Sequence, residues 1–194
     1  FKTSQQALYQ TQTRMVGEVL GALPQPGFQQ NIGFPNNYIP DAEAYHWYLQ
    51  AWSVYYDATP ETTHKSAQLF EKAIKADPHY RRAYLGKMFA ICSLASWWGN
   101  NKMKEVYEDY LKAQREAALD PSLTGDLMSV HGWARMWMWD LPGAERYFKK
   151  AISLHAKISF LWIGYAHALN MLGRHQEALQ IAQQGIHQEP GNVQ

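Results

Sequence analysis

The chain has 194 residues, enough for one ordinary domain or for a short array of repeats. Its 18 lysines and arginines nearly balance its 17 aspartates and glutamates, so we expect no direct nucleic-acid binding by this chain. No stretch approaches about 18 uninterrupted apolar residues, so we also expect no membrane span.

Residues 1–40 are predicted to form an N-terminal helix followed by an irregular strap. Leu8, Met15, Val19 and Leu23 lie at helical spacing, and Pro24 ends the pattern. The stretch 24–40 carries four prolines and two glycines and has no period. Since the chain begins at Phe1 rather than Met, it reads as a fragment of something longer.

Residues 41–194 are predicted to form a second unit built from helical hairpins. Asp41 is a suitable N-cap, and Thr59 with Pro60 opens the next helix. The expected helices, taken in chain order, span 42–57, 60–76, 80–98, 102–118, 124–138, 141–154, 158–172 and 175–187.

One phrase recurs four times along this unit. The copies read "LFEKAIKADP" (69–78), "QREAALDP" (114–121), "YFKKAISLHA" (147–156) and "IAQQGIHQEP" (181–190). The last two copies align over 34 residues, so that Ala144 matches Ala178 and Ala151 matches Gly185. This period is typical of helix–turn–helix solenoids, in which small residues let paired helices approach closely. The second copy carries about nine extra residues, which predicts longer helices or a wider turn there.

These positions resemble the tetratricopeptide repeat. The third copy supplies Gly132, Ala144, Phe148 and Ala151, and the fourth supplies Trp162, Ala166, Gly173, Ala178 and Pro190. Met128 and Ala156 depart from the pattern, because they stand where a tryptophan and a closing proline would be. The resemblance implies an all-α, helical-hairpin solenoid of about four repeats with the extra N-terminal helix and strap.

A narrower resemblance links the chain to tetratricopeptide domains of CadC/ToxR-type winged-helix regulators and of some bacterial adenylate cyclases. Five phrases occur in the order that those domains share: "LYQTQ" (8–12), "EAYHWYL" (43–49), "TTHKSAQLFEKAIKADP" (62–78), "ALDPS" (118–122) and "WDLPGAERYFKKAI" (139–152). The resemblance implies a sensory or interaction domain whose DNA-binding part lies elsewhere. It favours the periplasmic portion of an inner-membrane regulator, with a cytoplasmic location as the alternative.

Catalytic and metal-binding motifs are weak in this sequence. "HQEAL" at His175 lacks both the glutamate and the second histidine of a zinc helix, so we expect neither a metal nor a cofactor. Cys92 lies in an apolar run without an adjacent base, which predicts a buried, inert thiol. Arg81 and Arg82 are a single basic pair, expected to be solvated rather than part of a carboxylate clamp. We therefore expect no enzymatic activity.

The candidate site is an aromatic groove on the first helix of each hairpin. Aromatic residues make up 14% of the chain, more ring surface than a small core requires. Inner positions recur every three or four residues along such helices. The groove is predicted to contain Tyr48, Trp52, Tyr55, Phe89, Trp133, Met136, Trp137, Ile163, His167 and Asn170. At the turn that follows, Met138 and Trp139 are expected to be structural.

Two occupants of this groove remain open from the sequence. One is external: a protein, a peptide, a small effector or a second protomer in a homodimer. The other is internal, because the N-terminal helix or its strap could fold back and cover the rings. The leading functional expectation is a non-catalytic sensory or protein-interaction domain of a bacterial transcriptional regulator. The alternatives are a plain scaffold or adaptor and the regulatory tail of a nucleotide cyclase.

Overall fold

A computed structural model describes residues 38–98, 100–156, 158 and 160–188. These residues form α-helices and one short 3-10 helix, with no strand among them. The predicted helix within 1–37 and most of the strap lie outside the described residues. The helices pair into four consecutive hairpins: α2 (Ala42–Tyr55) with α3 (Pro60–Ala76), α4 (Arg81–Trp98) with α5 (Asn100–Ala117), α6 (Thr124–Trp137) with α7 (Leu141–Ser153), and α8 (Phe160–Met171) with α9 (His175–Gln188). The 3-10 helix η3 (Pro121–Leu123) precedes α6.

The helix boundaries agree with the sequence prediction to within two residues. The extra residues of the second copy lengthen both of its helices. Helices α4 and α5 have 18 residues each, whereas α6, α7 and α8 have 14, 13 and 12. The all-α, helical-hairpin array expected from the repeats is therefore confirmed.

Side-chain caps set where several helices begin. Asp41 accepts a hydrogen bond from the backbone N–H of Glu43, and Thr59 forms a reciprocal capping box with Thr62. Asp140 accepts from the Gly143 N–H at 2.9 Å and starts α7. Each cap satisfies an N–H group that has no partner within its own helix.

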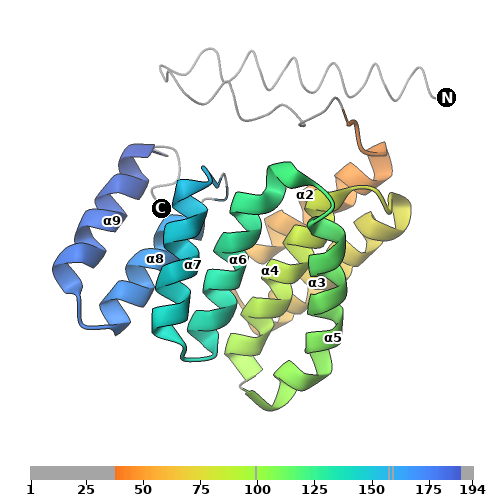
Figure 1. Cartoon of the computed structure of the whole chain (residues 1–194). Helices are drawn as coiled ribbons and strands as arrows, with labels where there is room; N and C mark the ends of the chain where they lie inside the picture. Colours follow the sequence, from red (N-terminus) through yellow and green to blue (C-terminus); the bar gives the residue numbers. More distant parts are fainter. Residues whose placement is uncertain (1–37, 99, 157, 159, 189–194) are drawn as a thin grey trace.

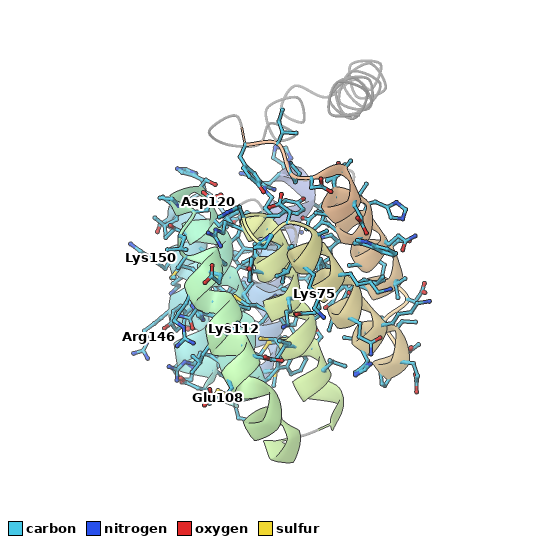
Figure 2. The ribbon with its side chains drawn as sticks, turned by 90° about the vertical axis from the view of Figure 1, so that its right-hand side faces the viewer. Lys75, Glu108, Lys112, Asp120, Arg146 and Lys150 are labelled. Carbon is cyan, nitrogen blue, oxygen red and sulfur yellow. The ribbon has the colours of Figure 1, made fainter. Side chains whose placement is uncertain are left out.

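The helices lie in two layers (Figure 1). Helices α2, α4, α6 and α8 form what we call the first-helix layer, in which α4 packs against α2 and α6, and α6 packs against α8. The second helix of each hairpin covers one side of this layer. Figure 2 shows charged side chains projecting from α3, α5 and α7, among them Lys75, Lys112 and Arg146.

The same close contact between a phenylalanine and a glycine occurs twice between neighbouring hairpins. Gly86 lies sixteen residues after Phe70, and Gly164 lies sixteen residues after Phe148. A Cβ atom added to Gly86 would come within 2.3 Å of the Phe70 ring, and one added to Gly164 within 2.8 Å of the Phe148 ring. Gly132, predicted to be a close-packing point, also faces the Phe148 ring, at 2.6 Å from its own added Cβ. Glycine at these positions lets the next helix approach, which is the basis of the stacked array.

None of the described helices combines the length and apolar content that crossing a membrane requires.

Candidate functional site

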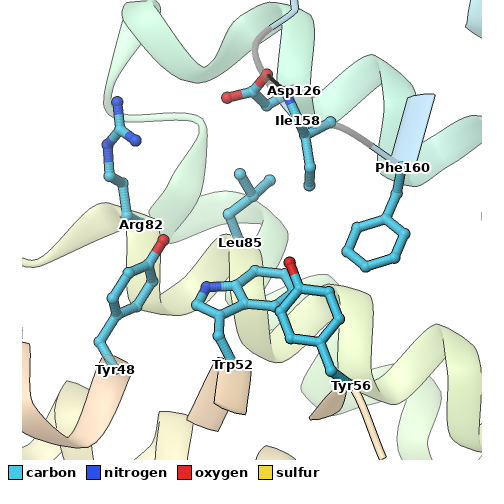
Figure 3. A pocket seen from close by; sticks show the side chains of 8 residues that line it. All are labelled: Tyr48, Trp52, Tyr56, Arg82, Leu85, Asp126, Ile158 and Phe160. Carbon is cyan, nitrogen blue, oxygen red and sulfur yellow. Dashed lines mark hydrogen bonds between the residues drawn. The ribbon is translucent and has the colours of Figure 1, made fainter. Parts of the chain in front are cut away.

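A cavity of about 220 Å³ lies between residues of the first-helix layer and of the connection into α8 (Figure 3). Its walls come from every hairpin in turn: α2 and its C-cap, the start of α4, the start of α6, and the connection that leads into α8. The lining residues are Tyr48, Trp52, Tyr56, Arg82, Leu85, Asp126, Ile158 and Phe160. Sites where several elements converge are typical places for ligands to bind.

Helix α2 supplies the aromatic floor. Tyr48, Trp52 and Tyr56 follow one another at intervals of four residues, so a helix places them on one face. Their rings interact in sequence: Tyr48 meets Trp52 edge-on at 6.3 Å between centroids, and Trp52 lies 6.4 Å from Tyr56. Solvent exposure increases along this floor: Tyr48 is half-buried, whereas Tyr56, at the rim, is 65% exposed.

Phe160 brings the last hairpin against the first. Its ring stacks on Trp52 at 6.1 Å and on Tyr56 at 5.8 Å, and it lies 4.7 Å from the Phe89 ring. Trp133 fixes this arrangement, because its indole Nε1 donates a hydrogen bond to the Phe160 carbonyl at 3.0 Å. The ring of Phe160, at the start of α8, thus fills part of the space beside the aromatic floor on α2.

Two charged side chains complete the cavity. Asp126 is only 5% exposed and lies in the first turn of α6, where the helix dipole favours a carboxylate. Its Oδ1 accepts a hydrogen bond from the Ile158 N–H at 3.1 Å. Arg82, half-buried at the start of α4, lies on the other side of the cavity (Figure 3). The site therefore presents a carboxylate and a guanidinium above a floor of rings.

Tyr48 stays protonated in this setting. Burial raises the pKa of its phenol, and the nearby Arg82 lowers it by a smaller amount. The hydroxyl, which points toward Arg82 in Figure 3, is therefore a hydrogen-bond donor at neutral pH.

The predicted groove residues divide into four groups in the structure. Tyr48 and Trp52 line the cavity. Phe89 and Met136 are 3% and 1% exposed, so they support the face from within the core. The half-buried members are Tyr55, Trp133 and Trp137. Tyr55 donates or accepts a 2.6 Å hydrogen bond with Ser93 Oγ, which ties α2 to α4.

The remaining predicted residues lie on α8, away from the cavity. Ile163 is 57% exposed, and His167 and Asn170 are also exposed. His167 meets the Trp137 ring edge-on at 6.5 Å, and Asn170 Oδ1 bonds to His175 Nδ1 at 2.6 Å. The structure thus separates this surface from the ring floor on α2.

Apart from Leu85, which lies four residues before the predicted Phe89, the cavity residues outside the predicted groove are Tyr56, Arg82, Asp126, Ile158 and Phe160. The four-residue spacing from Trp52 was a usable signal for Tyr56. Arg82 was expected to be solvated, but it lines the cavity, while its neighbour Arg81 pairs with Glu116 at 2.5 Å. Asp126, Ile158 and Phe160 lie near helix starts, where the spacing of apolar residues does not indicate which way a side chain points.

The turn between α6 and α7 also differs from expectation. Met138 and Trp139 were predicted to be structural, but they are 53% and 74% exposed. Trp139 also adopts a left-handed backbone, with φ 60°. Cys92, in contrast, is buried as predicted, and burial raises the pKa of its thiol to about 12.

In the part of the chain that the structure describes, no three His, Cys, Asp or Glu side chains gather in a way that would hold a metal ion. No protein-family model matches the chain, and no curated protein is significantly similar to it.

Proposed function

We propose that this chain is a non-catalytic recognition domain whose cavity on the first-helix layer binds a ligand. A single observation carries the proposal: one cavity takes side chains from all four hairpins. A molecule bound there contacts the first hairpin through Trp52 and the last through Phe160. Binding would therefore change how the hairpins are held relative to one another, which is what a sensor requires.

The proposal extends to the setting of the domain. The five phrases that resemble CadC/ToxR-type regulators favour a tetratricopeptide-type sensory region that controls a separate DNA-binding part. The sequence encoded before Phe1 tests this extension directly. A winged helix there supports a regulator, a cyclase domain supports the regulatory-tail alternative, and further repeats alone support a scaffold.

Ligand binding is tested by thermal unfolding of the chain with and without the low-molecular-mass fraction of a bacterial extract. We expect the unfolding midpoint to rise with the extract, since a ligand that binds only the native state stabilises it. Tyr56→Ala should reduce the rise, because the ring at the cavity rim is lost. Leu49→Ala is the matched control on the same helix: Leu49 is 49% exposed and does not line the cavity. An unfolding midpoint that does not change with the extract would count against a recognition domain for small ligands.

A protein scaffold is the second candidate, and the exposed Met138 and Trp139 favour it. Large apolar side chains that are exposed together mark many protein contacts. The two functions differ in where they act on the molecule. A scaffold would lose its partner on Trp139→Ala and keep it on Tyr56→Ala, and a ligand sensor would show the reverse.

A further inference from the structure

We propose that the cavity binds a small neutral molecule with one or two aromatic rings, of the size of a methylphenol or an indole. The inference rests on the proposed function, because it names the ligand class for the same cavity. Three features carry it: the volume of the cavity, the ring surface of its walls, and the partners that both charged side chains of the lining already have.

The volume of the cavity suits one small ring system. An apolar cavity of about 150 Å³ holds a benzene molecule. The cavity beside α2 has about 220 Å³, which leaves room for a substituted benzene or for two fused rings. Drug-sized ligands occupy larger pockets, of roughly 300 to 1,000 Å³. A peptide helix is larger still, with a diameter of about 10 Å.

The walls of the cavity are rich in flat ring surface (Figure 3). Four of the eight lining residues carry an aromatic ring: Tyr48, Trp52, Tyr56 and Phe160. The Phe160 ring lies at 19° to the Trp52 ring and at 24° to the Tyr56 ring, so these three rings have similar orientations. A flat ligand can lie with its whole face against such a ring, whereas a saturated ring is puckered. Aromatic pairs are also attracted beyond the effect of the area they bury.

The two charged side chains favour a neutral ligand, because each already interacts within the protein. Asp126 Oδ1 accepts from the Ile158 N–H at 3.1 Å, and both Asp126 and Arg82 have further interactions. An ionic ligand would have to displace one of these contacts, or enter a poorly solvated site without a counter-ion, and both are costly. A neutral molecule leaves the existing contacts in place.

The test is isothermal titration calorimetry of the intact chain with 4-methylphenol and with indole, both uncharged at neutral pH. Matched compounds change one property at a time. 4-Methylbenzylamine carries a positive charge, 4-methylbenzoate carries a negative charge, and 4-methylcyclohexanol has a saturated ring. We expect 4-methylphenol or indole to bind with a dissociation constant below about 1 mM. 4-Methylphenol should bind at least about tenfold more tightly than either ion, and roughly twofold to tenfold more tightly than the saturated alcohol.

Two variants connect this selectivity to the rings of the cavity. Tyr56→Leu and Phe160→Leu each replace a ring by an aliphatic side chain, so each should reduce the preference for 4-methylphenol over the saturated alcohol. Tyr56 is 65% exposed, and its variant is therefore expected to fold even if Phe160→Leu does not. Tyr147→Leu is the matched control: it makes the same change at a half-buried tyrosine of α7 that does not line the cavity.

The outcomes separate the ligand class from the recognition function. If the unfolding midpoint rises with the bacterial extract but neither neutral compound binds, the ligand class is wrong and the recognition function stands. Equal binding of an ion or of the saturated alcohol would also overturn the neutral aromatic class. The same loss of preference in Tyr147→Leu as in Tyr56→Leu would place the ligand outside this cavity. If neither the extract nor any compound has an effect, the recognition function fails as well.

Discussion

Trp139 is a large residue in a backbone conformation that suits glycine. It follows α6 with φ 60°, and Gly173, which lies 34 residues later in the equivalent turn after α8, has φ 76°. Both turns close in the same way, since Asp140 N donates to the Arg135 carbonyl and Arg174 N donates to the Leu169 carbonyl. The left-handed conformation costs a residue with a Cβ roughly 1 kcal/mol or more. Among the described residues, no hydrogen bond or ring contact of the Trp139 side chain offsets this cost.

We expect Trp139→Gly to raise the free energy of unfolding by about 0.5–1 kcal/mol. Relief of the strained backbone outweighs the greater entropy that glycine brings to the unfolded chain. Little burial is lost, because the side chain is 74% exposed. Urea unfolding monitored by far-UV circular dichroism measures the change.

Gly173→Ala is the matched control for that variant. It introduces a Cβ at the same type of position, where nothing lies within 4 Å, and should lower stability by about 1 kcal/mol. A loss of stability in Trp139→Gly would show that the indole packs against the protein, contrary to its exposure. A gain in stability would leave contact with a partner as the reason for a tryptophan at this turn.

Arg81 and Arg82 show why the site was only partly predictable. The two residues are adjacent, yet one pairs with Glu116 of α5 and the other lines the cavity. Successive residues on a helix point about 100° apart, so the exact helix start decides which arginine faces inward. Sequence boundaries carry an error of a residue or more, which is enough to exchange the two directions.

At the scale of elements, the helices were predictable because their signals are local. Asp41, Thr59 and Pro60 mark helix starts within a few residues, and the 34-residue period fixes the third and fourth hairpins. The connection into α8 had no such signal. Phe160 packs on Trp52, 108 positions earlier in the chain, and no pattern within one repeat specifies a contact over that distance. The floor of the cavity on α2 was therefore predictable, and its closure by Phe160 was not.

His131 joins α6 to α5 and makes stability depend on pH. Its Nδ1 lies 2.8 Å from the Tyr110 hydroxyl, and burial lowers the pKa of the imidazole below its usual 6.5, with a smaller effect of Arg135. The unfolded chain therefore takes up a proton more readily than the folded one. The free energy of unfolding should fall as the pH decreases from about 7.5 through 6.5 and on to the lower pKa of the folded state.

The urea midpoint, measured at several values between about pH 7.5 and 5.5, tests this contribution. Carboxylates also titrate toward the lower end, so the comparison with a variant isolates the histidine. His131→Gln keeps an acceptor for Tyr110 and should have a shallower slope than the wild type. His187→Gln, at an exposed position on α9, is the control for loss of a histidine. Equal slopes in His131→Gln and the wild type would contradict the assignment.

At the scale of the whole molecule, the array departs from a simple solenoid. In a linear repeat protein each repeat contacts only its neighbours, so distant repeats are coupled weakly. Here Phe160 contacts Trp52, Tyr55 and Tyr56 of the first hairpin as well as Phe89 of the second. The cavity lies at this contact, so a bound ligand and the first and last hairpins share the same side chains.

If Phe160 couples the ends of the array, Phe160→Ala should destabilise both ends together. We expect the free energy of unfolding to fall by about 2–3 kcal/mol, less than for a fully buried phenylalanine because the ring is only half-buried. Hydrogen exchange should accelerate in α2 as well as at the start of α8, although about a hundred residues separate them in sequence. Ile163→Ala, a truncation at a 57% exposed position of the same helix, should change neither region. Faster exchange confined to α8 would mean that the hairpins are coupled only to their neighbours, and a ligand in the cavity could then not act on the array as one unit.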